Sequence, residues 1–227
     1  MKLFFMALIS LLSLDASSQD KDWANLAKYA GDNKKLGAPA PGEKRVVFMG
    51  NSITEGWKIM DSAFFAGRPY IDRGISGQTT PQMLIRFRPD VIELKPAAVV
   101  ILAGINDIAE NTGPITLEAI FGNIVSMVQL AKANNIKVVM CSVLPANRFP
   151  WRPSILPAQK VIALNKMLLN YALQNKLVYV DYYSVMVDDQ QGLPKKYAED
   201  GIHPTLEGYK VMEGLVEEGI KKAMKKK

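Results

Sequence analysis

The chain contains one histidine, and the residues around it suit acid–base chemistry. His203 follows Asp200 by three positions, and Gly201 between them permits a tight turn. A carboxylate held against one ring nitrogen leaves the other nitrogen free to take a proton. A lone histidine is more often a surface residue or a satisfied core residue, so this segment alone leaves both interpretations open. A metal site built from several histidines is excluded.

A serine that such a base can activate stands at the end of an apolar run. Residues 46–49 are four consecutive apolar residues, a pattern typical of a buried strand in a parallel sheet. Gly50 and Asn51 then allow a turn, and Ser52 is a good residue to begin a helix. Ser52 can therefore cap a helix or act as a nucleophile. The two roles are compatible, because a helix that begins there also directs its N–H at a developing oxyanion.

Two later loops offer further hydrogen-bond donors. The loop after a short strand over residues 70–73 contains Gly77, and the loop after an apolar run over residues 97–102 contains Asn106. Acyl transfer needs donors that stabilise the oxyanion, each of which contributes about 3–4 kcal/mol. The backbone N–H of Gly77, the side-chain amide of Asn106 and the N–H of Ser52 are the candidates.

The elements that must position these residues alternate along the chain. Strand patterns cover residues 45–49, 70–73, 97–102, 136–143 and 177–180, and helical patterns cover 54–60, a stretch from Pro81, 116–134, 158–175 and 205–222. Parallel strands joined by right-handed crossovers predict an α/β fold, a three-layer α/β/α sandwich with a five-stranded parallel sheet. Residues 145–157 carry four prolines and are expected to be irregular.

The four loop segments together resemble one known family. Gly50-Asn51-Ser52-Ile53-Thr54, Gly74-Ile75-Ser76-Gly77-Gln78-Thr79, Gly104-Ile105-Asn106-Asp107 and Asp200-Gly201-Ile202-His203-Pro204 are similar, in the same order, to the motifs of the SGNH hydrolases, or GDSL-type esterases and lipases. The resemblance implies a serine esterase with a flavodoxin-like sheet and no required cofactor. It implies that Ser52 is the nucleophile, His203 the base and Asp200 its orienting partner. It also implies an oxyanion hole formed by Ser52, Gly77 and Asn106.

One position departs from that family's pattern. The family has aspartate before the serine, and this chain has Asn51, which keeps the size and the oxygen but loses the charge. The Gly-x-Ser-x-Gly turn of the α/β-hydrolases is absent, which argues against that other serine-hydrolase fold.

Several residues next to the motifs are candidates for contact with substrate. Asn51, Asp107 and Trp151 are the candidate substrate-binding residues. Structural ion pairing is the favoured alternative for Asp107 and for its counterparts Glu55 and Arg73. Whether Phe149 and Trp151 line or cover the pocket is left open. Core packing is the favoured interpretation of Trp57, Phe64, Phe65 and the single cysteine, Cys141.

Composition and the two ends of the chain limit which classes of function remain. The net charge of +6 comes partly from five lysines after residue 220, and no basic stripe is interleaved with aromatics, so nucleic-acid binding has little support. Lys2, the apolar residues 3–14 and the small residues 16–18 match a signal peptide cleaved near Ser18. We therefore expect a signal peptide over 1–18, an N-terminal helix (22–30) and connector (31–42) within 19–44, and a hydrolase domain over 45–227. No stable membrane anchor is expected.

The expected function is an exported serine esterase that removes a short acyl group, especially acetyl, from a carbohydrate or similar polar small-molecule substrate. Three alternatives remain: an acetylhydrolase or lysophospholipase acting on lipid esters, a catalytically silent glycan-binding protein, and an acyl transferase.

Overall fold

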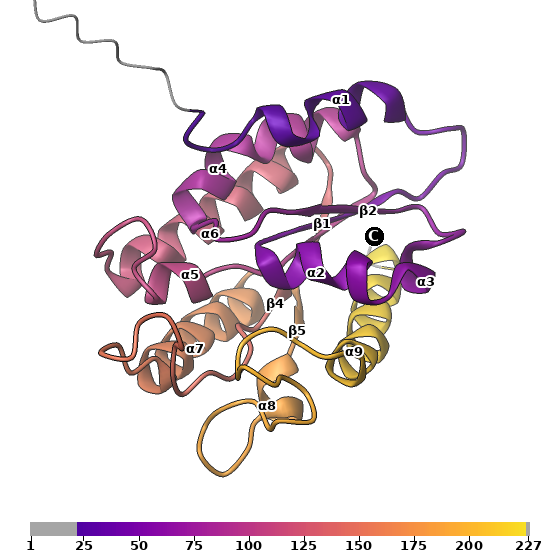
Figure 1. The fold of residues 1–227 in the computed structure, drawn as a ribbon. Coiled ribbons are helices and arrows are strands. Elements are labelled where there is room, and N and C mark those ends of the chain that lie inside the picture. Colours follow the sequence, from indigo (N-terminus) through magenta and orange to yellow (C-terminus); the bar gives the residue numbers. More distant parts are fainter. Residues whose placement is uncertain (1–21, 226–227) are drawn as a thin grey trace, which may run out of the picture.

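The computed structural model describes residues 22–225, in which five parallel strands form one sheet (Figure 1). The strands are β1 (Val46–Gly50), β2 (Tyr70–Gly74), β3 (Ala98–Ile101), β4 (Lys137–Cys141) and β5 (Val178–Val180). Their order is β2-β1-β3-β4-β5, the order of flavodoxin-like sheets. The predicted sandwich with a five-stranded parallel sheet is confirmed.

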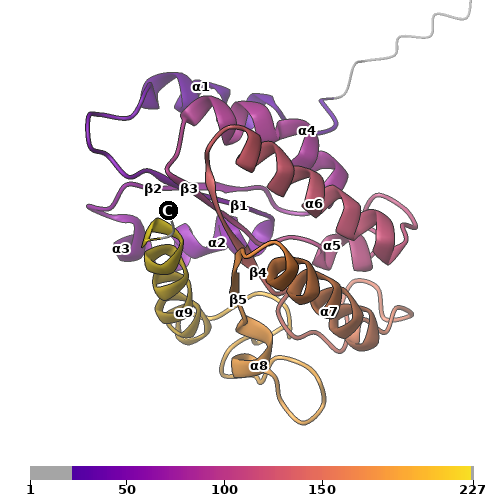
Figure 2. The ribbon, with the colours of Figure 1, turned by 180° about the vertical axis from the view of Figure 1, so that it is seen from behind.

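Helices cover both faces of the sheet (Figures 1 and 2). One face carries α4 (Thr80–Asp90), α6 (Leu117–Ala133) and α7 (Ala158–Gln174), and the other carries α2 (Ser52–Met60), α3 (Ser62–Phe65) and α9 (Leu206–Lys225). Helix α1 (Ala27–Leu36) packs on the outside of α4. The sequence patterns missed α3 and three other short elements, η1 (Ile92–Leu94), α5 (Ile105–Ile108) and α8 (Tyr182–Met186).

Strand β1 lies between β2 and β3, where the connections turn from one side of the sheet to the other. All five of its residues are buried, as expected for a strand covered on both faces. Ligands of open α/β sheets bind outside the carboxyl ends of the strands at such a reversal. The loops after β1 and β3 are therefore in the favoured place for a site.

An aromatic cluster under α2 fixes that helix to the sheet and to α9. The ring of Trp57 stacks between Phe64, at a centroid distance of 5.1 Å, and Tyr209, at 5.4 Å. Phe48 of β1 meets the edge of Trp57 at 5.8 Å. These rings confirm the core interpretation of Trp57, Phe64 and Phe65, and truncating a fully buried aromatic ring of this kind to alanine costs about 3–5 kcal/mol.

The single cysteine is also a core residue. Cys141 is 1% exposed at the end of β4, and burial raises the pKa of its thiol to about 12. A thiol with so high a pKa is a poor nucleophile at neutral pH.

The N-terminal helix differs from the expected one. The sequence predicts a helix over residues 22–30 and a connector over 31–42, whereas α1 runs from Ala27 to Leu36. The prediction took Gly31 as a breaker, but a glycine inside a helix costs only about 1 kcal/mol. The helix ends instead at Gly37, whose φ of 61° is left-handed.

The expected signal peptide, residues 1–18, lies outside the described residues. Among residues 22–225, no helix combines the length and the apolar character needed to cross a bilayer.

Candidate active site

The turn after β1 presents Ser52 at the start of α2. Asn51 precedes the helix, and its side-chain oxygen accepts a hydrogen bond from the N–H of Ile53 at 3.0 Å. The glycine at the end of β1 is needed, because a Cβ on Gly50 would lie 1.9 Å from Thr54 Oγ1. Ser52 is the first residue of the helix, so its N–H lies among those that have no intrahelical partner.

The loop before α9 holds a carboxylate against the imidazole. Asp200 Oδ1 accepts the N–H groups of Ile202 and His203, each at 2.8 Å. Its Oδ2 lies 2.6 Å from Nδ1 of His203. Gly201 makes this closed turn with a φ of 82°, a left-handed value that suits glycine.

These two loops, 151 residues apart in sequence, meet at a hydrogen bond. Ser52 Oγ lies 3.0 Å from Nε2 of His203. With the proton on Nδ1 directed at Asp200, Nε2 is the acceptor for the serine hydroxyl. Partial burial favours a higher pKa for Asp200, but the hydrogen bonds from the His203 ring and from the backbone outweigh it and hold the pKa below its usual value. The carboxylate therefore stays ionised beside the ring at neutral pH.

Tyr209 joins the two loops rigidly. Its hydroxyl donates to the carbonyl oxygen of Ile53 at 2.8 Å, and its ring stacks on Trp57 of the same helix. Since Tyr209 lies in the first turn of α9 and Ile53 in the first turn of α2, both helix starts are fixed against each other. The spacing between Ser52 and His203 is set by packing in the core.

The two loops that carry the other oxyanion candidates are also bonded to each other. Asn106 donates from Nδ2 to the carbonyl oxygen of Gln78 at 3.0 Å, which is the residue after Gly77. Gly77 has a φ of 77°. The amide of Asn106 keeps a second hydrogen for another acceptor. Donation to an oxyanion by Ser52, Gly77 and Asn106 stays a prediction.

A groove of about 300 Å³ runs alongside the serine and the histidine. Ser52, Ser76 and His203 lie along it, and Pro204 and two exposed apolar residues of α2, Ile59 and Met60, also line it. The groove therefore offers apolar surface beside the Ser52 hydroxyl.

Trp151 stands at the rim of the site. Its ring lies 6.4 Å from that of His203 at an interplanar angle of 30°, and 44% of the residue is exposed. Its Nε1 donates to Asn111 Oδ1 at 3.4 Å. Phe149 is fully buried, and its ring packs against that of Trp151 at a centroid distance of 5.2 Å. Of the two aromatic residues in the proline-rich segment, Trp151 alone can reach a substrate.

Two of the expected substrate-binding residues belong to the interior. Asn51 is 1% exposed and bonds to its own helix. Asp107 is also 1% exposed, and both of its carboxylate oxygens accept the N–H of Thr80. Burial raises the pKa of Asp107 to about 6. Neither side chain lines the groove beside Ser52, and contact of Asn51 and Asp107 with substrate stays a prediction.

The remaining neighbours hold the loops together. Glu55 forms an ion pair with Lys28, as the pairing interpretation expected. Arg73 bonds to Asn33 Oδ1 and to the carbonyl oxygen of Asp72, and it lies over the ring of Tyr29 at 4.6 Å. Its partners are therefore two neutral oxygens and an aromatic ring.

One buried polar residue near the site, Arg86, escaped the sequence patterns. Arg86, wholly buried in α4, donates from Nη2 to the carbonyl oxygen of Gly50 at 2.8 Å and from Nε to Gln78 Oε1. The one available signal was an arginine on the apolar side of a helix, three residues after Met83 and next to Phe87.

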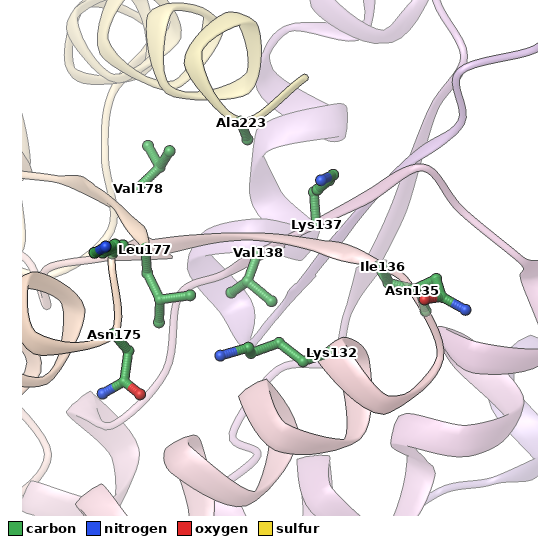
Figure 3. A pocket seen from close by; sticks show the side chains of 10 residues that line it. Lys132, Asn135, Ile136, Lys137, Val138, Asn175, Leu177, Val178 and Ala223 are labelled. Carbon is green, nitrogen blue, oxygen red and sulfur yellow. The ribbon is translucent and has the colours of Figure 1, made fainter. Parts of the chain in front are cut away.

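A separate hollow of about 530 Å³ lies at the opposite edge of the sheet, near the amino ends of β4 and β5 (Figure 3). Its lining includes Lys132, Asn175 and Leu177 and contains no hydroxyl, imidazole or carboxylate side chain. It therefore offers neither a serine hydroxyl nor an imidazole base to activate one. Among residues 22–225, no group of three or more His, Cys, Asp or Glu residues is arranged to hold a metal ion.

Comparison with known proteins places this chain in a family. The model of the GDSL-like Lipase/Acylhydrolase family matches residues 48–211. A solved structure of an inferred acylhydrolase from Bacteroides fragilis is 56% identical, with a TM-score of 0.88 over 90% of this chain and 100% of its own. A GDSL-like lipase from Bacteroides thetaiotaomicron is 54% identical, with a TM-score of 0.86 over 88% of this chain and 98% of its own. Esterase TesA of Pseudomonas aeruginosa is 30% identical over 70% of this chain and 74% of its own.

Proposed function

This chain belongs to the GDSL-like lipase and acylhydrolase family, and on that premise we propose that it is an exported serine esterase that removes short acyl groups, especially acetyl, from a carbohydrate or another polar alcohol. The observation that carries the proposal is the hydrogen-bonded series Ser52–His203–Asp200, with distances of 3.0 Å and 2.6 Å. A hydroxyl, an imidazole and a carboxylate in this order form a serine-hydrolase triad.

The proposed mechanism follows from the three contacts. Nε2 of His203 takes the proton of Ser52 as its oxygen attacks the ester carbonyl, and Asp200 stabilises the imidazolium that forms. The same proton is then given to the departing alcohol, which leaves an acyl-serine. Water, deprotonated by His203, attacks the acyl group and releases the acid and the free serine. The N–H groups of Ser52 and Gly77 and the amide of Asn106 stabilise both tetrahedral intermediates.

We assign to Trp151 the binding of the alcohol part of the ester substrate. An exposed aromatic ring next to the base offers an apolar face on which the face of a sugar ring can stack, and its Nε1 is held by Asn111. Within the described residues, no long apolar segment covers the groove, which suits a polar ester better than a long-chain lipid.

A lipid ester is the second candidate, and one observation favours it. Ile59 and Met60 are 78% and 51% exposed along the groove beside Ser52, so an acyl chain of several carbons would find apolar contact there.

Export is proposed from the N-terminal sequence. Lys2, the apolar residues 3–14 and the small residues before Gln19 match a secretory signal. Amino-terminal sequencing of the protein recovered from the cell envelope or the medium is expected to begin near Gln19. An intact Met1 on the protein, or recovery from the cytoplasm alone, would contradict export.

The activity is tested with 4-nitrophenyl acetate, butyrate and octanoate and with an acetylated sugar. Wild-type protein is expected to prefer acetate, and Ser52→Ala to lose turnover on every ester. The matched control is Ser126→Ala, which removes a serine hydroxyl that donates to the Gly122 carbonyl of its own helix, α6. A maximum on octanoate would favour the lipid-ester candidate, and glycan binding without turnover would favour a silent binding protein.

A further inference from the structure

The loop that carries Gly77, residues 74–78, bonds directly at Gly74 and Gln78 to a segment outside the family match. At Ser76 it bonds to Glu55, which forms an ion pair with the same segment. That match covers residues 48–211, whereas the segment is residues 22–36, which include α1. The contacts fall at Gly74, Ser76 and Gln78 and so flank Gly77 on both sides.

The first contact holds the end of β2. The hydroxyl of Tyr29 in α1 donates to the carbonyl oxygen of Gly74 at 2.5 Å. The ring of Tyr29 lies under the guanidinium of Arg73 at 4.6 Å, and Arg73 also bonds to Asn33 of the same helix. Helix α1 therefore fixes the point where the loop leaves the sheet.

The second contact acts through Glu55 of α2. One carboxylate oxygen of Glu55 accepts both the N–H of Ser76, at 2.8 Å, and its hydroxyl, at 2.5 Å. The other oxygen pairs with Lys28 of α1. Partial burial favours a higher pKa for Glu55, but Lys28 and Ser76 outweigh it and hold the pKa low. Lys28 thus orients the carboxylate that holds Ser76.

The third contact is buried. Gln78, 3% exposed, donates from Nε2 to the carbonyl oxygen of Ala24 at 2.6 Å. Its Oε1 accepts from Arg86, which also binds the carbonyl oxygen of Gly50 just before the nucleophile turn. The side chains of Gln78 and Arg86 therefore connect the N-terminal segment, the loop and the end of β1.

The segment is in turn anchored to α4. Gln82 donates from Nε2 to the carbonyl oxygen of Trp23 at 2.6 Å, and Asn33 donates to Asp90 Oδ1 at 2.7 Å. Both ends of the segment are thus fixed to a helix that packs on the sheet.

The carbonyl oxygen of Gly77 accepts a long hydrogen bond from Asn111 Nδ2 at 3.4 Å, so Gly77 relies mainly on its bonded neighbours in the loop for its position. A Cβ built at Gly77 would meet no atom within 4 Å, so it has no close packing on that side. We propose that residues 22–36, through Lys28 and Tyr29, are a positioning element that sets the N–H of Gly77 for the oxyanion of the ester reaction. This inference rests on the proposed function.

Loss of the positioning element has a characteristic kinetic effect. An oxyanion donor acts in the transition state and hardly at all in the bound substrate, so kcat falls while KM stays unchanged. Loss of a whole donor costs about 10²- to 10³-fold in kcat. Displacement of Gly77 without its loss is expected to cost about 10-fold.

The test compares two double variants of the full chain. Lys28→Met/Tyr29→Phe removes the ion pair and the hydroxyl that reach the loop and leaves Gln78 in place. Its matched control, Tyr179→Phe/Lys222→Met, removes a tyrosine hydroxyl bonded to the Asn165 carbonyl and a lysine paired with Glu218, both far from the loop.

Two readouts are measured: kcat and KM on 4-nitrophenyl acetate, and hydrogen–deuterium exchange of the peptide that contains residues 74–79. The first variant is expected to lose about 10-fold in kcat at constant KM and to exchange faster in this peptide, while the control matches wild type. Unchanged kcat, unchanged exchange in the loop, or equal effects in both variants would overturn the inference. Turnover that survives Ser52→Ala would refute the proposed function, whereas the exchange result tests the loop contacts without reference to activity.

Discussion

Replacing Asp200 with asparagine is expected to lower kcat by about 10²- to 10⁴-fold, or about 3–5 kcal/mol in activation free energy. The oxygen of the asparagine can still accept the N–H groups of Ile202 and His203, which now bond to Asp200 Oδ1. The amide nitrogen replaces Oδ2, 2.6 Å from Nδ1 of His203. A donor at that place requires Nδ1 to accept, so the ring proton moves to Nε2, which then cannot take the proton of Ser52.

The size of the decrease in kcat depends on how far the side chain of Asp200 is exposed to solvent. The side chain of Asp200 is 41% exposed, so water can replace part of its interaction with the imidazolium, and the lower half of the range is expected. Because the folded pKa of Asp200 is depressed, its stabilising effect is present at neutral pH and is lost as the pH falls through that pKa. The stability difference between wild type and Asp200→Asn is therefore expected to vanish in acid.

The assay is steady-state hydrolysis of 4-nitrophenyl acetate, with thermal unfolding at pH 7 as the check on folding. Asp188→Asn is the matched control, because Asp188 Oδ1 likewise accepts two backbone N–H groups, those of Gln190 and Gly192, and contacts no imidazole in the described structure. A kcat for Asp200→Asn within threefold of both wild type and control, in a folded protein, would refute the reasoning.

Three further variants probe how the site is supported. Asp72 is buried with Oδ2 unpaired and a pKa raised to about 7 by burial, so ionisation destabilises the fold as pH rises. Asp72→Asn is expected to add about 2–3 kcal/mol more stability at pH 8 than at pH 5 in urea unfolding, and equal gains at both would contradict the burial argument. Gly74→Ala would place a Cβ 2.1 Å from the backbone nitrogen of Glu55, so α2 must move. The expected cost is about 1–3 kcal/mol of stability together with about 10-fold in kcat, and wild-type kinetics would contradict it. Met60→Ser is expected to lower kcat/KM for the butyrate ester about 5-fold and to leave acetate unchanged; equal effects on both esters would show that the groove does not take the acyl chain.

The sequence predicted those parts of the site that depend on local pattern. Ser52 and Asn106 follow apolar runs, and runs of this kind become parallel strands whose carboxyl ends share one edge. His203 was recognisable because Asp200 and Gly201 make a closed turn within three residues. Such features need no knowledge of distant neighbours.

The features that were missed depend on tertiary contacts. The sequence suggests that Asp107 is an exposed carboxylate in a loop. In the structure, the N–H of Thr80, 27 residues earlier, donates to both of its oxygens. The sequence suggests that Arg86 is a charged residue on the exposed side of a helix. It is instead wholly buried, because Gln78 and Asp90 accept hydrogen bonds from its guanidinium. Helix α1 extends past Gly31 because its contacts with α4 offset the weak helix propensity of glycine.

The most direct test of the central claim is to trap the acyl-enzyme. Wild-type protein is quenched in acid during turnover of 4-nitrophenyl acetate, and its peptides are mapped by mass spectrometry. The account predicts one acetyl group on Ser52, absent in Ser52→Ala and retained in Ser126→Ala. An acetyl group on any other residue, or full turnover by Ser52→Ala, would contradict the assignment of Ser52 as the nucleophile.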